Sequence, residues 1–430
     1  MKNAASGLFV CPTTGFHTRI VPQIAGILCR ILLVVFLASL FLVAGCSDDE
    51  VDVTFPTPPQ PSSKLWLYDV FGTTETDTEG NIISNVFACG YGGSMVHFDG
   101  ETWTQVDMNT SHNIVSIWGP GDGTLYACGF GGSIWRNSGT GWSNMDSGTD
   151  SYLVGLGSFN NDIHVCGVDG ALRQLSGNTW EDTKTVMILR DPVGAPLDTL
   201  SRSIDIESLV TINHYFIGGA YRLPSYDEDE NIGTEYTDGM VLGKDISFPE
   251  QPQFDWHLRP LRADEIVPSE WIQCSTSDSS GLVGNNYLGT TEGWVFQLSD
   301  SQMTGLTWVK VHPRITTDPR AGINDMWLDE LGNLFMVTHS GQVVFQSHDY
   351  KYNETGFRVV QQITSGSLMG LWGEDSDNLF AVGLIEKTVF RLRYDFTERI
   401  FEVSEDLLPF IEKSPVGGDN LDKFGRPLTW

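Results

Sequence analysis

The sequence predicts an all-β protein, and three observations point to this class. Glycine is abundant, with 46 residues, and aromatic residues make up 11% of the chain. No long segment shows the 3.6-residue hydrophobic period of an amphipathic helix. A motif of short apolar strands and glycine-rich turns recurs at intervals of about 40–50 residues, the length of a four-stranded propeller blade. Together these observations predict a seven-bladed β-propeller of four-stranded blades.

The repeat is clearest in three segments, which are Val86–Trp103, Leu125–Trp142 and Ile163–Trp180. Each contains an apolar strand ending in Cys-Gly, a glycine-containing turn, a second strand and a tryptophan. The three Cys-Gly pairs are 39 and 38 residues apart, and the tryptophans keep the same spacing. Such fixed spacing is typical of structural repeats that stack on one another.

Four more degenerate copies bring the number of units to seven. Two are clear, at Leu334–Phe345 and Leu379–Phe390, and two are weaker, at His214–Gly219 and Tyr287–Phe296. An apolar strand precedes each unit, as in Ile114–Gly119. One such sheet cannot bury both of its faces, so the units are expected to pack radially and close a ring.

The second unit shows how four strands are assigned. We expect strands at 114–118, 124–128, 133–136 and 142–145, because glycine-rich turn sequences separate these segments. The turn glycines are expected to adopt positive φ, which only glycine reaches at little cost.

The amino terminus predicts a secretory leader. Residues 31–44 carry no charge, basic residues precede them, and the run ends in Val43-Ala44-Gly45-Cys46. This segment resembles a bacterial lipobox, in which the thiol of Cys46 is acylated and becomes the new amino terminus. The alternatives are a soluble secreted protein and a retained transmembrane helix, for which the run is short.

These features divide the chain into four parts. Residues 1–45 are the expected lipoprotein signal peptide, and 46–64 a proline-rich tether. The propeller is expected over 65–412 and a tail over 413–430. The predicted location is the cell envelope, lipid-anchored to a membrane. Ser47 favours the outer membrane or the cell surface over the inner membrane.

The charge balance excludes one class of partner. The chain has 25 basic and 55 acidic residues, a formal net charge of −30. Removing the leader removes three basic residues and gives 22 minus 55, or −33. Such a charge repels phosphates, so nucleic acid is not an expected partner. The acidity serves solubility or, alternatively, binding of a cation or a basic partner.

Cysteine usage favours packing over cross-linking. Four cysteines follow the lipobox, and three of them share one repeat position. Equivalent strands of adjacent blades diverge, which works against bridging, so we expect small buried residues. The four are Cys89, Cys128, Cys166 and Cys274.

The repeats resemble those of two propeller groups. Asn137–Trp142 resembles the Asp box of bacterial neuraminidases, and Asp99–Trp103 and Ser176–Trp180 are one residue shorter. The blades also resemble photosystem II stability/assembly factor-like propellers over most of residues 65–395. The resemblance implies a fold and leaves the function open. Neuraminidase chemistry would need an arginine cluster and a tyrosine nucleophile, and the arginines show no positional match to such a set.

Three aspartates stand out in the first strands of the units. Asp69, Asp205 and Asp325 align with Ser116 of the second unit. In a propeller this strand lies nearest the axis, so these acids are expected to line or cap the channel. Neighbouring carboxylates repel unless a cation or protons neutralise them. Calcium is the candidate cation, and the alternative is three solvated or hydrogen-bonded acids.

A second candidate calcium site lies in an insertion of the fourth unit, residues 226–239. Its oxygen-bearing residues are spaced as in a calcium loop, although Ile232 stands where that loop has its glycine. The alternative is a solvated acidic hairpin. The candidate ligands are Asp227, Asp229, Asn231, Glu235 and Asp238.

We predict a non-catalytic binding or assembly module for a protein or glycan ligand. Tyr221, Tyr226, Trp256 and Trp271 of the irregular middle units are candidate contact residues. The alternatives are a propeller glycoside hydrolase or lyase and a purely structural surface component. A convergent pair of carboxylates in a channel-mouth pocket would favour the hydrolase.

Overall fold

In the computed structural model, short antiparallel strands form sheets that follow one another along the chain. The structure describes residues 65–76, 82–159, 161–183, 187–189, 205–213, 216–223, 236–243, 256–260, 271–277, 285–301, 305–311, 315, 322–351 and 356–408. All of them belong to one compact unit, Pro61–Trp430. No helix in these ranges is both long enough and apolar enough to span a membrane.

Several predictions from sequence lie outside the described residues. They are the leader 1–45, Cys46, the tether 46–64, the tail 413–430, and residues 226–235 of the acidic insertion, with Tyr226, Asp227, Asp229, Asn231 and Glu235. Asp205, Tyr221, Asp238 and Trp256 lie in described strands, but only their backbone positions are described.

The first three sheets each contain four consecutive strands. The first comprises β1 (Leu67–Thr76), β2 (Ile82–Gly90), β3 (Met95–Phe98) and β4 (Trp103–Val106). The second comprises β5 (Ile114–Trp118), β6 (Leu125–Gly129), β7 (Ile134–Asn137) and β8 (Trp142–Met145). The third comprises β9 (Leu153–Phe159), β10 (Asp162–Gly167), β11 (Leu172–Ser176) and β12 (Thr179–Asp182). Short 3₁₀ turns η1 (Tyr91–Gly93) and η2 (Phe130–Gly132) follow β2 and β6.

The last three sheets have the same form. The fifth comprises β18 (Ile272–Ser277), β19 (Asn286–Thr290), β20 (Val295–Ser301) and β21 (Gly305–Val311). The sixth comprises β22 (Ile323–Leu328), β23 (Leu334–Thr338), β24 (Gln342–Gln346) and β25 (Arg358–Gln362), with η4 (His348–Lys351) before β25. The seventh comprises β26 (Leu368–Asp375), β27 (Asn378–Gly383), β28 (Thr388–Asp395) and β29 (Ile400–Leu407).

The fourth sheet departs from the prediction of seven four-stranded blades. It has five strands, in the order β13-β17-β16-β15-β14. They are β13 (Met187–Leu189), β14 (Asp205–Ile212), β15 (Ile217–Leu223), β16 (Tyr236–Gly243) and β17 (Trp256–Pro260). β13 pairs with β17 in parallel, on the edge away from β14. The expected regular blade is therefore observed six times and is wrong for the fourth unit.

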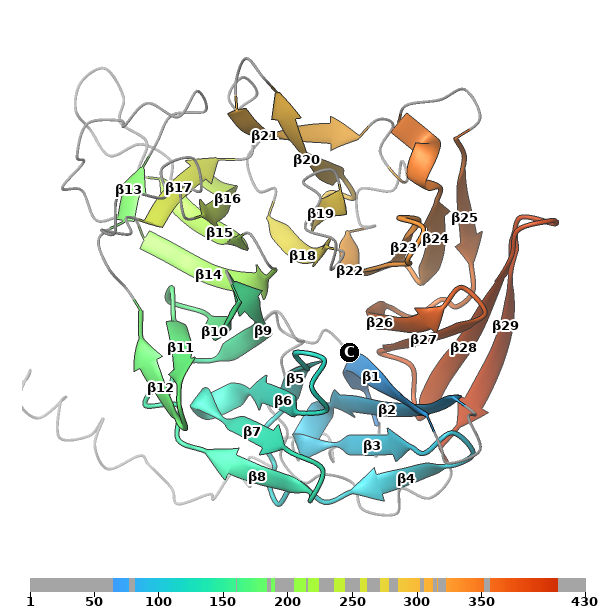
Figure 1. Ribbon diagram of the computed structural model, residues 1–430, viewed down its shortest axis with the longest axis horizontal. Coiled ribbons are helices and arrows are strands. Elements are labelled where there is room, and N and C mark those ends of the chain that lie inside the picture. Colours follow the sequence, from blue (N-terminus) through green and yellow to red (C-terminus); the bar gives the residue numbers. More distant parts are fainter. Residues whose placement is uncertain are drawn as a thin grey trace, which may run out of the picture. The chain divides into compact units, whose positions relative to one another are not determined.

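Contacts between innermost strands place the sheets as blades around a centre (Figure 1). β1 contacts β5, β5 contacts β9, and the series continues through β14, β18 and β22 to β26. β26 in turn contacts β1, which closes the ring. Apolar clusters lie between neighbouring blades, as where Val70 and Val86 of the first blade meet Phe380 and Val382 of the last.

Side chains and loop backbone, rather than a shared strand, join the last blade to the first. The carboxylate of Asp406 on β29 accepts hydrogen bonds from Trp103 Nε1 at 2.9 Å and from Arg391 Nε at 2.6 Å. The Arg391 guanidinium lies 4.4 Å from the ring centroid of Phe98 on β3. The Lys387 N–H donates to the Leu65 carbonyl at 3.0 Å.

The glycine that follows each repeat cysteine is required by a close backbone approach. At Gly90 an added Cβ would lie 1.9 Å from the Trp66 carbonyl oxygen, and at Gly129 it would lie 2.0 Å from that of Asn113. Gly90 has an extended backbone, with φ −174°, so a positive φ is not the reason for glycine at this position. The expected positive φ is found two residues after each of these glycines, at Gly92 (φ 61°) and Gly131 (φ 63°).

The turns that resemble Asp boxes are held by side-chain oxygens. Asp99 Oδ1 accepts from the N–H groups of Glu101 and Thr102 at 2.9 and 2.7 Å. Asn137 Oδ1 accepts from those of Gly139 and Gly141 at 2.9 and 3.3 Å. Such Asx turns stabilise tight hairpins without the full box motif. Kinship with the Asp-box family stays a prediction.

Candidate functional site

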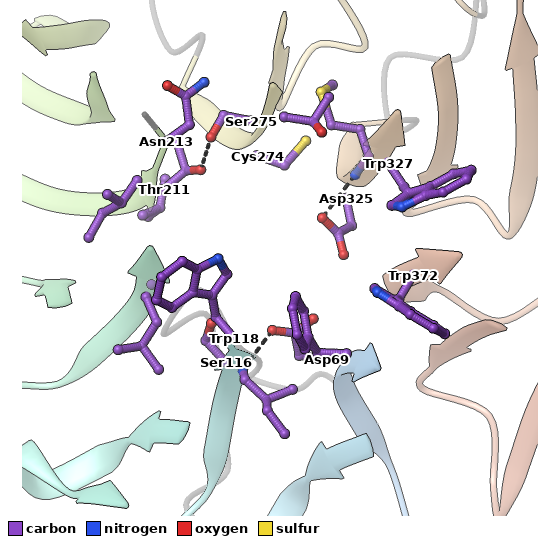
Figure 2. A pocket seen from close by; sticks show the side chains of 18 of the residues that line it. Asp69, Ser116, Trp118, Thr211, Asn213, Cys274, Ser275, Asp325, Trp327 and Trp372 are labelled. Atoms are coloured by element: carbon purple, nitrogen blue, oxygen red, sulfur yellow. Dashed lines mark hydrogen bonds between the residues drawn. The ribbon is translucent and has the colours of Figure 1, made fainter. Parts of the chain in front are cut away.

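A central cavity of about 630 Å³ lies where the innermost strands meet (Figure 2). Every blade contributes to its lining, through β1, β5, β9, β14, β18, β22 and β26. Among its described lining residues, the charged ones are Asp69 and Asp325. These two residues contribute a formal charge of −2 when both are ionised.

A recurring β-bulge sets which side chains face the centre. In the first blade the register shifts between Leu67 and Asp69, and in the second between Ile114 and Ser116. We call the residue after the bulge the bulge position. In the six regular blades its occupants are Asp69, Ser116, Gly155, Cys274, Asp325 and Gly370. In β14 of the fourth blade the register shifts twice, before Ser208 and before Thr211.

Large aromatic side chains form one wall of the cavity. Two residues after the bulge position stand Trp327, Trp372, Phe71 and Trp118, in the sixth, seventh, first and second blades. These blades are consecutive around the ring, so the four rings form a continuous arc. Phe71 and Trp372 have ring centroids 6.4 Å apart. Trp118 and Trp327 are half-buried, so part of each ring remains open to the cavity.

Each ring in this arc, except Trp118, lies over a glycine of the next blade. A Cβ on Gly72 would lie 2.5 Å from the Trp372 ring, and one on Gly373 would lie 3.1 Å from that of Trp327. A Cβ on Gly119 would lie 3.3 Å from Phe71. These ring-on-glycine contacts interlock neighbouring blades. At Gly72 the indole of Trp372 occupies the space of a side chain, whereas at Gly373 and Gly119 Leu379 and Thr124 of the same blade lie nearer than the ring.

Hydroxyl and amide groups form the opposite wall, from the third, fourth and fifth blades. Thr211 Oγ1 and Ser275 Oγ form a short hydrogen bond between β14 and β18 (Figure 2). The polar lining residues of these three blades are Ser158, Asn161, Thr211, Asn213, Gln273, Ser275, Thr276 and Ser277. The cavity therefore has an aromatic side and a hydrogen-bonding side.

The two cavity carboxylates clamp adjacent blades. Asp69 accepts from its neighbour Val70 N at 2.9 Å and from Ile117 N of the second blade at 2.9 Å. Asp325 accepts from Met326 N at 2.9 Å and from Leu371 N of the seventh blade at 2.8 Å. In both residues one carboxylate oxygen accepts from an N–H of the same blade, and the other accepts from an N–H of the next blade. These bonds supply acceptors for backbone N–H groups that would otherwise be costly to bury.

The other bulge positions make related contacts. Cys274 Sγ donates to the Ile323 carbonyl of the next blade at 3.4 Å. Gly155 and Gly370 permit direct backbone approach, since a Cβ there would lie 2.7 Å from the Val210 oxygen and 2.8 Å from the Asp69 Cα. The position is therefore a joint between blades whichever residue fills it.

Asp205 does not occupy the position that the sequence alignment predicted. It is the first residue of β14 and pairs with Arg222 of β15, whereas β14 lines the cavity with residues 210–213. The expected set of three axial aspartates is therefore reduced to two. Among the described ranges, no three or more metal-ligating side chains are grouped. Calcium binding in the acidic insertion stays a prediction.

Asn324 is fully buried and lines the cavity, with its Nδ2 donating to the Leu368 carbonyl at 2.6 Å. Its Oδ1 has no hydrogen-bond partner in the part of the chain that is described.

Trp271, a predicted contact residue, is not among the described residues that line the cavity. It lies just before β18 and is half-buried, and its backbone N–H donates to Thr291 Oγ1 at 2.9 Å.

Among the described residues, Cys89, Cys128, Cys166 and Cys274 are buried and form no disulfide. Burial raises the pKa of Cys128 well above the usual value of a thiol, and the nearby Cys166 and Asp69 add to this. Burial likewise raises the pKa of Cys166. These thiols are held in the neutral form, which is unreactive as a nucleophile.

Sequence reasoning missed the aromatic arc, although its signal was present. Trp118-Gly119 and Trp372-Gly373 recur at the ends of first strands. A large ring followed by glycine at one repeat position indicates that the ring of one unit fills the space left by the glycine of the next. The polar wall has no comparable signal, because two of its three blades, the fourth and the fifth, carry only weak copies of the repeat.

No family model matches the chain, and no curated protein matches its sequence. Solved structures with a similar fold include YCF48 from Cyanidioschyzon merolae, with 15% identity, a TM-score of 0.46, and 76% of this chain and 94% of that one covered. YCF48 bound to D1 peptide has 13% identity, a TM-score of 0.45, and coverage of 78% and 96%. A streptogramin B lyase has 9% identity, a TM-score of 0.48, and coverage of 80% and 95%. Similarities this distant do not identify a ligand or a reaction.

Proposed function

We propose that the protein is a lipid-anchored, extracytoplasmic binding module whose central cavity receives part of a protein or glycan ligand. The observation that carries this proposal is the cavity itself, with its aromatic wall facing a wall of hydroxyl and amide groups. Its volume of about 630 Å³ is within the range of small-molecule sites. It can hold a sugar unit, a peptide end or one long side chain, whereas the rest of a larger ligand would contact the ring face.

The proposed role is non-catalytic. Each cavity carboxylate accepts two backbone hydrogen bonds, which stabilise its charged form. A general acid must instead carry a proton and be free to donate it. Asp69 and Asp325 are in this respect suited to holding blades together and to supplying fixed negative charge.

A glycoside hydrolase or lyase is the second candidate, and one observation favours it. Two carboxylates line one cavity, as the two acids of a glycosidase would. The discriminating variants are Asp69→Asn and Asp325→Asn, assayed against any oligosaccharide that binds. If the unsubstituted protein cleaves the oligosaccharide and a variant binds it without cleavage, the protein is an enzyme. If the unsubstituted protein binds the oligosaccharide without cleaving it, the result supports a non-catalytic binding module.

The proposed lipid anchor is inferred from the leader sequence and from Cys46. Cells expressing the full chain and a Cys46→Ser variant are to be labelled with a clickable palmitate analogue. We expect the unsubstituted chain to incorporate the palmitate analogue and to be found in the membrane fraction. The variant is expected to do neither. Membrane retention of Cys46→Ser without label would instead support an uncleaved helix.

Ligand binding is tested with the full chain purified in detergent. The chain is presented to a glycan array and used to capture partners from solubilised envelope. Trp118→Leu alters the cavity wall and Phe396→Leu, on the exposed turn after β28, is the matched control. The cavity is supported as the binding site if Trp118→Leu abolishes binding of a ligand that Phe396→Leu still binds. No retained ligand at all would favour the purely structural component.

A further inference from the structure

We infer that the outer edge of β29 binds an extended, basic segment of a partner protein, which adds to the seventh blade as a further strand. This surface is separate from the central cavity, so the inference goes beyond the proposed function and does not depend on it. β29 is the last strand in the order of its sheet and pairs with β28 (Figure 1). A strand at the edge of a sheet is a template on which an extended segment of another chain can pair.

β29 is long for the outermost strand of a blade. It has eight residues, whereas the outermost strands of the first three blades, β4, β8 and β12, have four each. Short edge strands are one way in which proteins prevent pairing with other chains. The eight residues of β29 are instead enough to pair with a strand of ordinary length.

The register between β28 and β29 determines which backbone groups face the outer edge. Leu408 N–H donates to the Lys387 carbonyl at 2.9 Å, and the same register continues through β29. Residues of an antiparallel strand alternate between bonding to the neighbouring strand and facing away from it, so the even-numbered residues bond to β28. The backbone groups that face outward are those of Phe401, Val403, Glu405 and Leu407.

A glutamine side chain already pairs with the first of these outward positions. Phe401 N–H donates to Gln361 Oε1 at 2.8 Å, and Gln361 Nε2 donates to the Phe401 carbonyl at 2.9 Å. The amide group of Gln361, which belongs to β25 of the sixth blade, thus makes the two bonds that the backbone of an added strand would make. The outer edge of β29 therefore has a geometry with which amide groups pair.

Apolar side chains are exposed along the rest of this edge. Val403 is 38% exposed and Leu407 is 68% exposed. Both lie on one face of the strand, because residues separated by an even number of positions share a face. Side chains that stand opposite one another on paired strands interact, so apolar residues of an added strand would cover Val403 and Leu407.

Glu405 sets the charge of the partner. It is exposed and stands between Val403 and Leu407 on the same face. Two copies of β29 that paired antiparallel about Glu405 would place this glutamate opposite itself, and like charges directly opposite are destabilising. The formal net charge of −30 also works against pairing between two copies. A lysine or arginine opposite Glu405, with an apolar residue two positions away on each side, complements the edge.

The test is calorimetric titration of the full chain in detergent with the peptide acetyl-Thr-Val-Thr-Lys-Thr-Val-Thr-amide. Its lysine can stand opposite Glu405 and its valines opposite Val403 and Leu407, in either strand direction. The acidic counterpart has glutamate in place of the lysine. We expect the lysine peptide to bind with an affinity that falls as salt is added, and the glutamate peptide to bind about 2- to 30-fold more weakly.

Methylation of the peptide backbone separates strand pairing from simple attraction between charges. One probe is N-methylated at both valines, whose N–H groups would face β29, and the matched probe is N-methylated at the two inner threonines, whose N–H groups would face away. We expect the first to bind about fivefold more weakly or worse, and the second to keep its affinity. Any other pattern of the two overturns strand pairing in this register.

Three variants of the chain locate the binding. Glu405→Lys should reverse the preference, so that the glutamate peptide binds more tightly than the lysine peptide. Glu101→Lys, at an exposed acid of the turn between β3 and β4, is the matched control and should change neither affinity. Glu405→Pro removes an outward N–H without removing a bond to β28, and it should abolish binding of both peptides. If Glu405→Pro fails to fold, the charge reversal still decides.

The remaining outcomes contradict the inference. If the lysine peptide does not bind, or if it binds Glu405→Lys as tightly as the unsubstituted chain, the edge of β29 is not a site for a basic strand. If sedimentation shows a dimer that Glu405→Pro abolishes, the edge belongs to a second copy of the chain. Trp118→Leu alters only the central cavity and should leave the peptide affinity unchanged, so failure here leaves the proposed cavity function standing.

Discussion

The contact between Trp372 and Gly72 predicts a destabilising substitution with a specific rescue. In Gly72→Ala the new methyl group would lie 2.5 to 2.8 Å from three atoms of the indole ring. Optimal carbon contacts are about 3.5–4.0 Å, so the ring or the strand must move. Overpacking of this kind costs about 1–3 kcal/mol in the free energy of unfolding.

The ring has little freedom to move away. Trp372 is 8% exposed and packs against Phe71 on one side and Phe380 on the other, with centroids 6.4 and 6.0 Å away. Gly72 has no positive φ, so alanine is allowed there by the backbone and the loss comes from space alone. Trp372→Leu by itself should cost about 2–4 kcal/mol, since much buried ring area is lost.

The double variant distinguishes the interlock from general damage. In Gly72→Ala with Trp372→Leu the added methyl occupies part of the space of the ring, so the combined loss should be smaller than the sum by at least about 1 kcal/mol. The assay is urea unfolding of the full chain in detergent, followed by far-ultraviolet circular dichroism.

Gly155→Ala is the matched control. Its Cβ would lie 2.7 Å from the backbone oxygen of Val210, which a side-chain truncation cannot remove. It should be destabilising, and its effect should add to that of Trp372→Leu, because the two sites lie in the third and seventh blades. Additivity of Gly72→Ala with Trp372→Leu would refute the interlock.

Three further predictions concern ring closure, pH and thiol reactivity. Arg391→Ala should lower the free energy of unfolding by about 1 kcal/mol, because Arg391 pairs with Asp406 of its own blade, which accepts from Trp103 of the first blade, and packs on Phe98 of that first blade. Arg393→Ala, whose partners are more exposed, should have almost no effect. Burial lowers the pKa of His97 below its usual 6.5, so the fold favours the neutral ring and should lose stability relative to His97→Gln as pH falls below about 6.5 in urea titrations at several pH values. Ellman's reagent should leave four thiols unreacted in the native state and reach all of them in denaturant, and these are Cys89, Cys128, Cys166 and Cys274.

The sequence predicted the regular blades because each carries its own markers. In the second unit, strands expected at 114–118, 124–128, 133–136 and 142–145 are observed at Ile114–Trp118, Leu125–Gly129, Ile134–Asn137 and Trp142–Met145. In the first three units a Cys-Gly pair at a close backbone approach and a glycine turn define the register. These requirements are local, so they are visible in a single repeat.

The fourth unit lacks these markers, and the prediction failed there. Only the short segment His214–Gly219 marked the repeat there, and β15 begins within it, at Ile217. Since side chains alternate along a strand, an error in register changes which residues face the centre. Asp205 was misplaced for this reason. Asp69 and Asp325 lie in well-marked units, where their strand position was predictable but their bonds to Ile117 and Leu371 were not.

The same residues join neighbouring blades and line the cavity, so the stability of the fold is linked to ligand binding. Three of the rings that lock the sixth, seventh, first and second blades together also form the aromatic wall, and the two carboxylates that clamp blades supply the cavity charge. A ligand against these groups would add contacts to the residues that join the blades. Ligand binding should therefore raise the free energy of unfolding by the amount that its affinity and concentration dictate. The largest protection is expected at strands β1 and β22, which carry both a ring of the wall and a clamping carboxylate.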